Sequence, residues 1–127
     1  MKAAVKHHAP QAEYYFDEGC YITELSNSAD DPGVSIARAR VAPGVTTRWH
    51  YLLDTAERYV LLAGSGRVEV EGVAAQPVGP GDTVLIPPGA RQRIANTGEQ
   101  DLVFLAVCSP RFTAACYVDA EPGTASD

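Results

Sequence analysis

Basic residues are scarce in this sequence. The 127 residues include 10 Lys and Arg against 16 Asp and Glu, which gives a formal net charge of -6 and a pI of about 4.9. Nucleic acids and anionic membranes bind proteins that carry a basic patch. The charge balance therefore argues against nucleic acid or a membrane surface as a partner.

Long apolar runs are also missing, and cysteines are few. No apolar stretch reaches the length of a transmembrane helix, and residues 1–10 lack the apolar segment of a signal peptide. The cysteines Cys20, Cys108 and Cys116 are odd in number, so we expect free thiols rather than a disulfide framework. We expect a cytoplasmic protein with one domain, because this is a typical single-domain length.

Helical signals are absent as well. No stretch combines a helical period of apolar residues with end caps. Short β-rich runs alternate instead with turns that contain Gly, Pro or Asn. This pattern predicts an all-β sandwich or barrel. The expected strands are Tyr21–Ser26, Val34–Val41, Thr46–Leu53, Glu57–Ala63, Gly66–Val70, Thr83–Ile86, Arg91–Ala95 and Leu102–Cys108, with a further short piece at Ala115–Val118.

Two blocks of regularly spaced residues lie in the middle of the chain. Each block begins with a turn-forming Gly and contains at least one more turn-forming Gly or Pro. Polar residues lie at fixed intervals from these turn residues. The first block contains Gly44, His50, Leu52, Glu57 and Gly64, and the second contains Gly81, Pro87, Gly89, Gln92 and Asn96.

The order and spacing of these residues resemble the two motifs of the cupin family, G-x5-H-x-H-x(3,4)-E-x6-G and G-x5-P-x-G-x2-H-x3-N. The resemblance covers residues 44–96 directly and implies a single jelly-roll β-barrel of short antiparallel strands, open at one end. In the family a metal ion lies inside the barrel, held by the three His and the Glu of these motifs. Leu52 and Gln92 occupy two of the His positions here, so the implied ligand set is reduced to His50, Glu57 and Gln92.

Two interpretations of His50, Glu57 and Gln92 stay open. In one, they bind a divalent ion such as Mn, Fe, Ni or Zn, with a lower affinity than a three-His site and with a preference shifted toward ions that favour oxygen ligands. In the other, they hydrogen-bond one another in a metal-free barrel. The remaining histidines, His7 and His8, precede the barrel and complete a three-His site only if the N-terminal segment folds in.

The alternation of side chains along a strand groups the candidate site residues. Arg48, His50 and Leu52 share one face of a predicted strand, Glu57 and Tyr59 share a face of the next, and Gln92 lies on a third. If His50 points into the barrel, these side chains line one cavity of the mixed polar and apolar kind that binds small molecules. The predicted catalytic residues are His50, Glu57 and Tyr59, and the predicted substrate-binding residues are Arg48, Leu52, Tyr59, Gln92 and Arg40.

Several of these residues also have a purely structural interpretation. Arg48 either binds an anionic group of a substrate or lies in water at the rim. Arg40, which shares a strand face with Arg38, either projects into the barrel mouth or is solvated outside. Tyr59 is either a general acid or a core tyrosine with a satisfied hydroxyl.

The cupin resemblance implies a protein that binds a small molecule inside the barrel. The first hypothesis is a metal-assisted isomerase, lyase or cyclase that acts on a small polar or carbonyl-containing substrate. A cupin dioxygenase is an alternative, although iron oxygenases usually need two His and a carboxylate. The other alternative is a metal-free ligand-binding or sensory module.

The two ends of the chain are expected to lie outside the barrel. We expect an N-terminal arm over residues 1–19, the barrel domain over residues 20–118 and a flexible acidic tail over residues 119–127. The arm contains the aromatic cluster Tyr14-Tyr15-Phe16, which packs on the barrel or on a partner chain. Together with the cupin resemblance, this cluster predicts a homodimer.

Overall fold

Buried and more exposed side chains alternate along the short strands of this molecule. In the strands of residues 66–70 and 92–96, for example, every second side chain is buried, as expected when one face of a sheet packs on a core. The structure is a computed structural model and describes residues 1–122. Its strands are β1 (Tyr14–Phe16), β2 (Cys20–Ser26), β3 (Ser35–Val41), β4 (His50–Leu52), β5 (Ala56–Ala63), β6 (Gly66–Val70), β7 (Val73–Val78), β8 (Thr83–Ile86), β9 (Gln92–Asn96), β10 (Leu102–Ser109) and β11 (Tyr117–Asp119).

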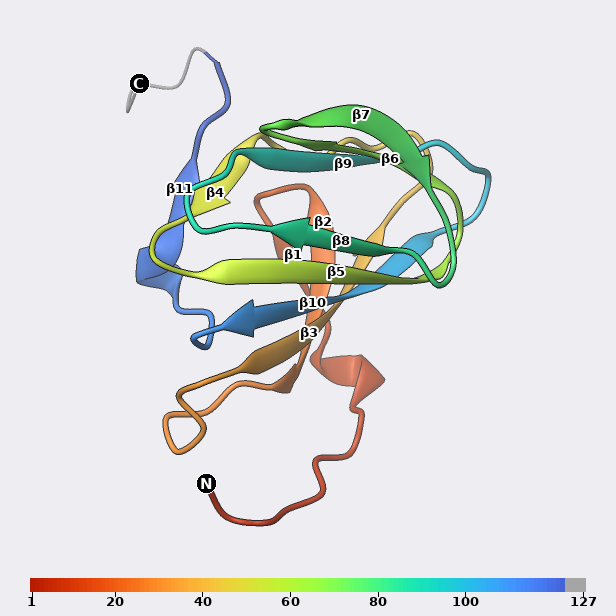
Figure 1. The fold of residues 1–127 in the computed structure, drawn as a ribbon. Coiled ribbons are helices and arrows are strands. Elements are labelled where there is room, and N and C mark those ends of the chain that lie inside the picture. Colours follow the sequence, from red (N-terminus) through yellow and green to blue (C-terminus); the bar gives the residue numbers. More distant parts are fainter. Residues whose placement is uncertain (123–127) are drawn as a thin grey trace.

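The strands form two antiparallel sheets. One sheet has the order β1-β2-β3-β10-β5-β8, and the other has the order β11-β4-β9-β6-β7. Figure 1 shows the sheets facing each other, with β6, β7 and β9 above β5, β8 and β10. Two 3₁₀ turns, η1 (Pro10–Ala12) and η2 (Ala114–Cys116), complete the secondary structure of the described residues. The predicted all-β jelly-roll architecture is confirmed.

The hydrophobic core fills the space between the inner faces of the two sheets. It combines inward residues from both ends of the chain and from the middle, so that no single hairpin could bury this surface alone. The fully or nearly fully buried members are Cys20, Ala39, Val41, Tyr59, Leu61, Val68, Val70, Ile86, Ile94, Leu102 and Phe104.

Two residues of the spaced blocks hold turns of the barrel. The amide nitrogen of Asn96 donates to the carbonyl oxygens of Val41 and Gln100, at 2.8 Å each, and its oxygen accepts from the Gly98 N–H. Gly64 has φ +87, and a Cβ there would lie 2.6 Å from the Asp101 carbonyl oxygen. These positions therefore serve the fold and not the chemistry.

The predicted strand over residues 46–53 is shorter in the structure. Only His50–Leu52 forms a strand, with an isolated bridge between Thr46 and Ala95. The intervening N–H groups bind elsewhere, because Arg48 donates to the Glu18 carbonyl oxygen at 2.8 Å and Trp49 donates to the Glu121 carboxylate at 2.7 Å. Residues from both ends of the chain thus interrupt the ladder just before His50.

Strands β1 and β7 were not among the predicted strands. Both lie at the edge of a sheet. The β7 sequence contains two Ala and a Pro and is mostly exposed, so it lacks the alternation that marks a half-buried strand. Pro77 is tolerated because β7 pairs with β6 alone.

The predicted arm and tail both contribute strands. β1 lies within residues 1–19 and pairs with β2, so the aromatic cluster packs on the barrel's own sheet. Asp119, the first residue of the predicted tail, belongs to β11, which pairs with β4. Residues 123–127 of that tail lie outside the described residues.

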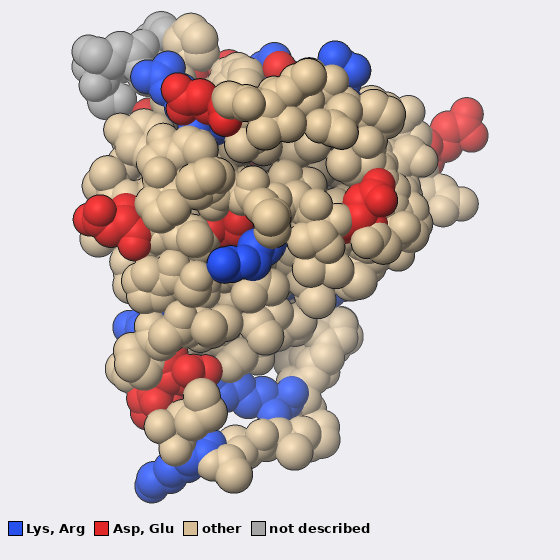
Figure 2. Space-filling view, viewed as in Figure 1, with Lys and Arg blue, Asp and Glu red and all other residues tan. Residues whose placement is uncertain are grey.

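The surface carries dispersed charges. On the face seen in Figure 2, Lys and Arg side chains of the described residues are scattered over a mostly uncharged surface and form no continuous basic patch. Within residues 1–122, no helix has the length and apolar character needed to cross a membrane.

Candidate functional site

Four of the predicted site residues come together inside the barrel. Glu57 and Tyr59 lie on β5, Gln92 on β9 and His50 on β4, and all four side chains are buried. His50 and Gln92 are direct partners across the two strands. Strand alternation therefore predicted the inward direction of these four side chains, but of the four only Glu57 and Tyr59 line the cavity described below.

Glu57, Gln92 and Tyr59 form one chain of hydrogen bonds. The Tyr59 hydroxyl donates to the Gln92 side-chain oxygen at 2.5 Å, and the Gln92 amide nitrogen donates to Glu57 Oε1 at 2.8 Å. The Cys108 thiol contacts Glu57 Oε2 at 3.8 Å. Tyr59 thus sets the orientation of the amide, and the amide holds the carboxyl group in place.

Glu18 is the site residue that sequence reasoning missed. Its Oε1 lies 3.3 Å from His50 Nε2, and its Oε2 lies 3.6 Å from the Cys20 thiol. It sits in the turn between β1 and β2, where Gly19 has φ +109 and donates to the Phe16 carbonyl oxygen. The sequence Asp17-Glu18-Gly19 between two β-rich runs was the available hairpin signal.

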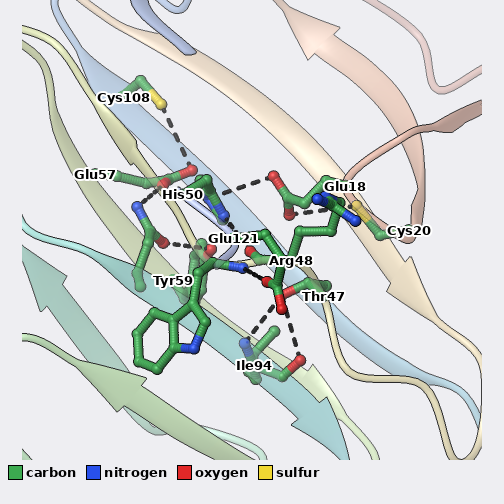
Figure 3. A network of polar contacts seen from close by, with 12 residues as sticks. Glu18, Cys20, Thr47, Arg48, His50, Glu57, Tyr59, Ile94, Cys108 and Glu121 are labelled. Carbon is green, nitrogen blue, oxygen red and sulfur yellow. Dashed lines mark hydrogen bonds and ion pairs between the residues drawn. The ribbon is translucent and has the colours of Figure 1, made fainter. Parts of the chain in front are cut away.

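His50 is oriented by a backbone carbonyl. Its Nδ1 lies 2.8 Å from the Arg48 carbonyl oxygen, which can only accept, so Nδ1 carries a proton and Nε2 faces Glu18. The imidazole stacks on the Tyr117 ring at a centroid distance of 5.1 Å. Figure 3 shows His50 together with the Glu18 and Glu57 carboxyl groups.

Burial shifts the pKa values of the Glu18 and Glu57 carboxyl groups to near neutral pH. Burial raises the pKa of Glu57 to about 7, with a further contribution from the charge of Glu18. Burial also raises the pKa of Glu18 to about 7 and lowers the pKa of His50. The Glu18–His50 pair is therefore favoured as a neutral carboxylic acid beside a neutral imidazole. Burial likewise raises the pKa of the Cys20 and Cys108 thiols, which stay protonated.

A cavity of about 60 Å³ reaches both carboxyl groups. It has room for a few water molecules or the reacting end of a small substrate. Its rim includes Tyr14, which is 45% exposed, and the exposed Glu24. The lining residues are Tyr14, Phe16, Glu18, Ile22, Glu24, Ser35, Ala37, Ala39, Glu57, Tyr59, Phe104, Ala106, Cys108 and Phe112.

A family model described as "Cupin domain" matches residues 37–108. The chain belongs to the cupin family. It is 31% identical over 102 residues to an uncharacterised protein of Methanocaldococcus jannaschii, covering 79% of this chain and 81% of that protein. It is 40% identical over 63 residues to a glucose-6-phosphate isomerase of Pyrococcus abyssi, covering 46% of this chain and 33% of the isomerase. The cupin chain thus spans about a third of the isomerase's length.

Among solved structures, the cupin resembles Pac13, described as a nucleoside dehydratase, from Streptomyces. The TM-score is 0.74 with 16% identity, over 91% of this chain and 90% of the other. At this identity the likeness concerns the fold alone.

The structure places two predicted substrate-binding arginines away from the cavity of the cupin. Arg48 lies in the irregular segment before β4. Its side chain is 41% exposed, and its guanidinium is paired with Asp119 at 3.1 Å. Arg40 lies on the outer face of β3, paired with Glu13 at 2.7 Å and stacked over the Tyr21 ring at 4.2 Å. The prediction for Arg48 failed because strand alternation does not extend through the broken segment.

Leu52 is buried but does not line the cavity. It packs with Cys108 and Cys116 in a small apolar cluster, against Phe112 and Tyr117. Its inward direction agrees with the prediction from alternation. Leu52 therefore adds apolar surface to the barrel interior on the strand of His50, and it makes no direct contact in the cavity.

The donor atoms of the cupin do not fit a resident metal ion. Both ends of the Gln92 amide are engaged, by Tyr59 and by Glu57, and His50 Nε2 faces Glu18. Leu52 supplies no donor. In residues 1–122, no group of three or more His, Cys, Asp or Glu side chains is arranged to hold a metal. His7 and His8 are exposed in the segment before η1 and do not complete the predicted set.

Proposed function

We propose that this cupin is an enzyme of the isomerase or lyase class, which moves protons on a small substrate inside the barrel by general acid–base catalysis without a resident metal. The observation that carries the proposal is the pair of buried carboxyl groups, Glu18 and Glu57, that line one cavity and each have a pKa of about 7. A group with a pKa near the working pH both accepts and donates protons efficiently. Such perturbed pairs are typical of active sites.

The two carboxyl groups have complementary roles in this proposal. Glu57, held by the Gln92 amide, takes a proton from a carbon next to a carbonyl group. Glu18 gives its proton to the carbonyl oxygen, so that a substrate with a hydroxyl group on that carbon becomes an enediol without any change of oxidation state. In an isomerisation, Glu57 returns its proton to the former carbonyl carbon, and the neighbouring hydroxyl group gives its proton to Glu18. In a dehydration, a hydroxyl group on the next carbon leaves as water with the proton from Glu57, and the enediol returns a hydroxyl proton to Glu18.

His50 and Tyr59 act through these carboxyl groups. His50 Nε2, 3.3 Å from Glu18, holds or returns the proton that Glu18 exchanges. Tyr59 is a positioning residue, because its hydroxyl fixes the Gln92 amide that binds Glu57. The names of two similar proteins, an isomerase and a dehydratase, are compatible with this chemistry, since both reactions need an acid and a base.

Deuterium exchange tests the proposal. The protein is incubated in D2O with EDTA and a panel of small hydroxy-carbonyl compounds that includes dihydroxyacetone and aminoacetone, and proton NMR follows the hydrogens next to the carbonyl. We expect the exchange rate to fall by about 10²- to 10⁴-fold in Glu57→Gln. We expect Glu18→Gln to lower the exchange rate as well. Glu99→Gln, an exposed carboxyl far from the cavity, is the matched control and keeps the wild-type rate.

The outcomes separate the competing functions. Binding of a panel member without exchange would favour the ligand-binding module over the enzyme. Exchange that disappears with EDTA and returns with Mn, Fe, Ni or Zn would favour the metal-assisted enzyme. No exchange with any compound, or full exchange in both Gln variants, would overturn the proposal.

A further inference from the structure

The lining of the cavity is acidic and aromatic. Three carboxyl side chains face it, those of Glu18 and Glu57 inside and that of Glu24 at the rim. Five aromatic rings accompany them, and within residues 1–122 no Lys, Arg or His lines the cavity. The aromatic members are Tyr14, Phe16, Tyr59, Phe104 and Phe112.

The cationic side chains nearest in the chain to the cavity residues are engaged elsewhere. Arg58, between the lining residues Glu57 and Tyr59, donates to the Ser109 hydroxyl oxygen at 3.0 Å. Arg38 and Arg40 are both paired with Glu13 on the outer face of β3. Arg111, next to the lining residue Phe112, donates to the Asn27 side-chain oxygen at 2.8 Å. These contacts leave no guanidinium in the wall to compensate the cavity carboxyl groups when they ionise.

We infer that the cavity selects a substrate with a small cationic ammonium group and rejects carboxylates and phosphates. A cation is attracted both to the carboxyl groups and to the faces of the aromatic rings. An anion would bring like charges together in a site that water screens poorly whenever a lining carboxyl group is ionised. The cavity of about 60 Å³ limits the group that enters to a few non-hydrogen atoms.

Glu24 is the first carboxyl group that an approaching cation meets. It is exposed at the rim beside Tyr14, whereas Glu18 and Glu57 are buried. A cleft lined by one sign of charge concentrates ligands of the opposite sign. Glu18 and Glu24 both precede residues 37–108, the part that matches the family model, so this selectivity is a property of this chain's own N-terminal region.

This inference rests on the proposed function for the reaction that follows binding, but the selectivity itself is measured without turnover. NMR titration at constant ionic strength compares three probes of similar size, namely ethanolamine, ethylene glycol and glycolate. We expect ethanolamine to bind at least about tenfold more tightly than ethylene glycol, and glycolate to bind most weakly. We expect Glu24→Gln to weaken ethanolamine binding several-fold, and the matched charge change Glu99→Gln to leave it unaltered.

The result distinguishes this inference from the proposed function. The inference would be overturned if glycolate bound as tightly as ethanolamine, or if no probe bound. In that case, acid–base catalysis would still be supported if deuterium exchange were lost in Glu57→Gln. A clear preference for ethanolamine without exchange on any carbonyl compound would instead support the selectivity and contradict the enzyme. In the exchange assay, the inference predicts faster exchange of aminoacetone than of dihydroxyacetone.

Discussion

At the residue scale, the two buried carboxyl groups have similar surroundings. Glu57 receives a hydrogen bond from the Gln92 amide and a contact from the Cys108 thiol. Glu18 contacts the His50 ring and the Cys20 thiol. These partners satisfy the oxygens without supplying a permanent positive charge, so burial dominates and the pKa of each carboxyl group rises. A buried arginine in either place would have lowered the pKa and removed the capacity for proton transfer near neutral pH.

The raised pKa of Glu57 predicts a stability that falls as the pH rises. The folded carboxyl group has a pKa of about 7 against an ordinary value of 4.5, so the folded state binds more protons between these limits. Its stabilising contribution is present below about pH 4.5 and is lost as the pH rises through 7. We expect Glu57→Gln to be more stable relative to wild type at pH 7.5 than at pH 5, by on the order of 2–3 kcal/mol.

Urea unfolding at the two pH values measures this difference. Glu18, whose pKa is also raised, and His50, whose lowered pKa has the opposite effect on the pH dependence, are present in both proteins, so the difference between the two profiles reports chiefly on Glu57. Parallel pH profiles for wild type and Glu57→Gln would show that the pKa of Glu57 is not raised.

The Tyr59 hydroxyl is predicted to stabilise the fold through Gln92. Tyr59→Phe leaves the buried Gln92 oxygen without its donor, which costs about 1–3 kcal/mol in free energy of unfolding. Tyr51→Phe, on the other face of β4, is the control and should change stability by less than about 0.5 kcal/mol. Equal effects of the two substitutions in urea unfolding would contradict a network in which Tyr59 positions the amide.

At the element scale, the short strand β4 is the centre of the site. Its ladder stops before His50 because the N–H groups of Arg48 and Trp49 bind Glu18 and Glu121. The same interruption turns the Arg48 carbonyl toward the His50 ring. A continuous strand over residues 46–53 would have used these groups for sheet pairing, and would have left the imidazole without this partner.

The β1–β2 turn is predicted to position Glu18. Gly19 has φ +109, a region that side chains of L-residues disfavour, so Gly19→Ala should destabilise the protein by about 1–2 kcal/mol and slow deuterium exchange. Gly33→Ala is the control, because a Cβ at Gly33 meets no atom within 4 Å and its φ is unexceptional. An exchange rate unaffected by Gly19→Ala would argue against a role of this turn in the site.

At the scale of the whole molecule, the barrel alone does not make the site. The family match covers residues 37–108, which include His50, Glu57 and Gln92. The partners of His50 come from both flanks, Glu18 before this segment and Tyr117 after it. Proteins that share the barrel can therefore differ in the chemistry of its interior.

The unsuitability of the site for a resident metal predicts the result of a metal-binding experiment. Leu52 and Gln92 lie on the inner face beside His50 and Glu57, so the double substitution Leu52→His and Gln92→His should create a site that retains about one Ni²⁺ or Zn²⁺ per chain. Wild-type protein soaked with the same ions should retain far less by elemental analysis. Stoichiometric metal in the wild type would restore the metal-assisted hypothesis.

The homodimer stays a prediction. Tyr15 in β1 is 58% exposed and continues to offer an apolar contact for a second copy. Light scattering should give twice the chain mass of 13.5 kDa, and Tyr15→Ser should shift the mass toward the monomer. Leu85→Ser, at an exposed residue of the opposite edge strand β8, is the control. A monomer mass for wild type at micromolar concentration would contradict the prediction.

The all-β class, most of the strands and an inward direction for four site residues can be predicted from the sequence alone. These four residues are His50, Glu57, Tyr59 and Gln92. Turn residues and the alternation of side chains are local properties, and they persist wherever a strand is regular. The spaced Gly, Pro and Asn residues identified the barrel for the same reason, because they serve particular turns.

Long-range packing, in contrast, brings Glu18 into the site and keeps Arg48 and Arg40 out of it. Glu18 reaches His50 because a hairpin turn folds onto an interrupted strand, a contact between segments distant in the chain that no local period specifies. Arg40 and Arg48 form ion pairs with Glu13 and Asp119, residues from the two ends. The acidic character of the cavity follows from this packing, because it brings Glu18 to the cavity and leaves the arginines outside.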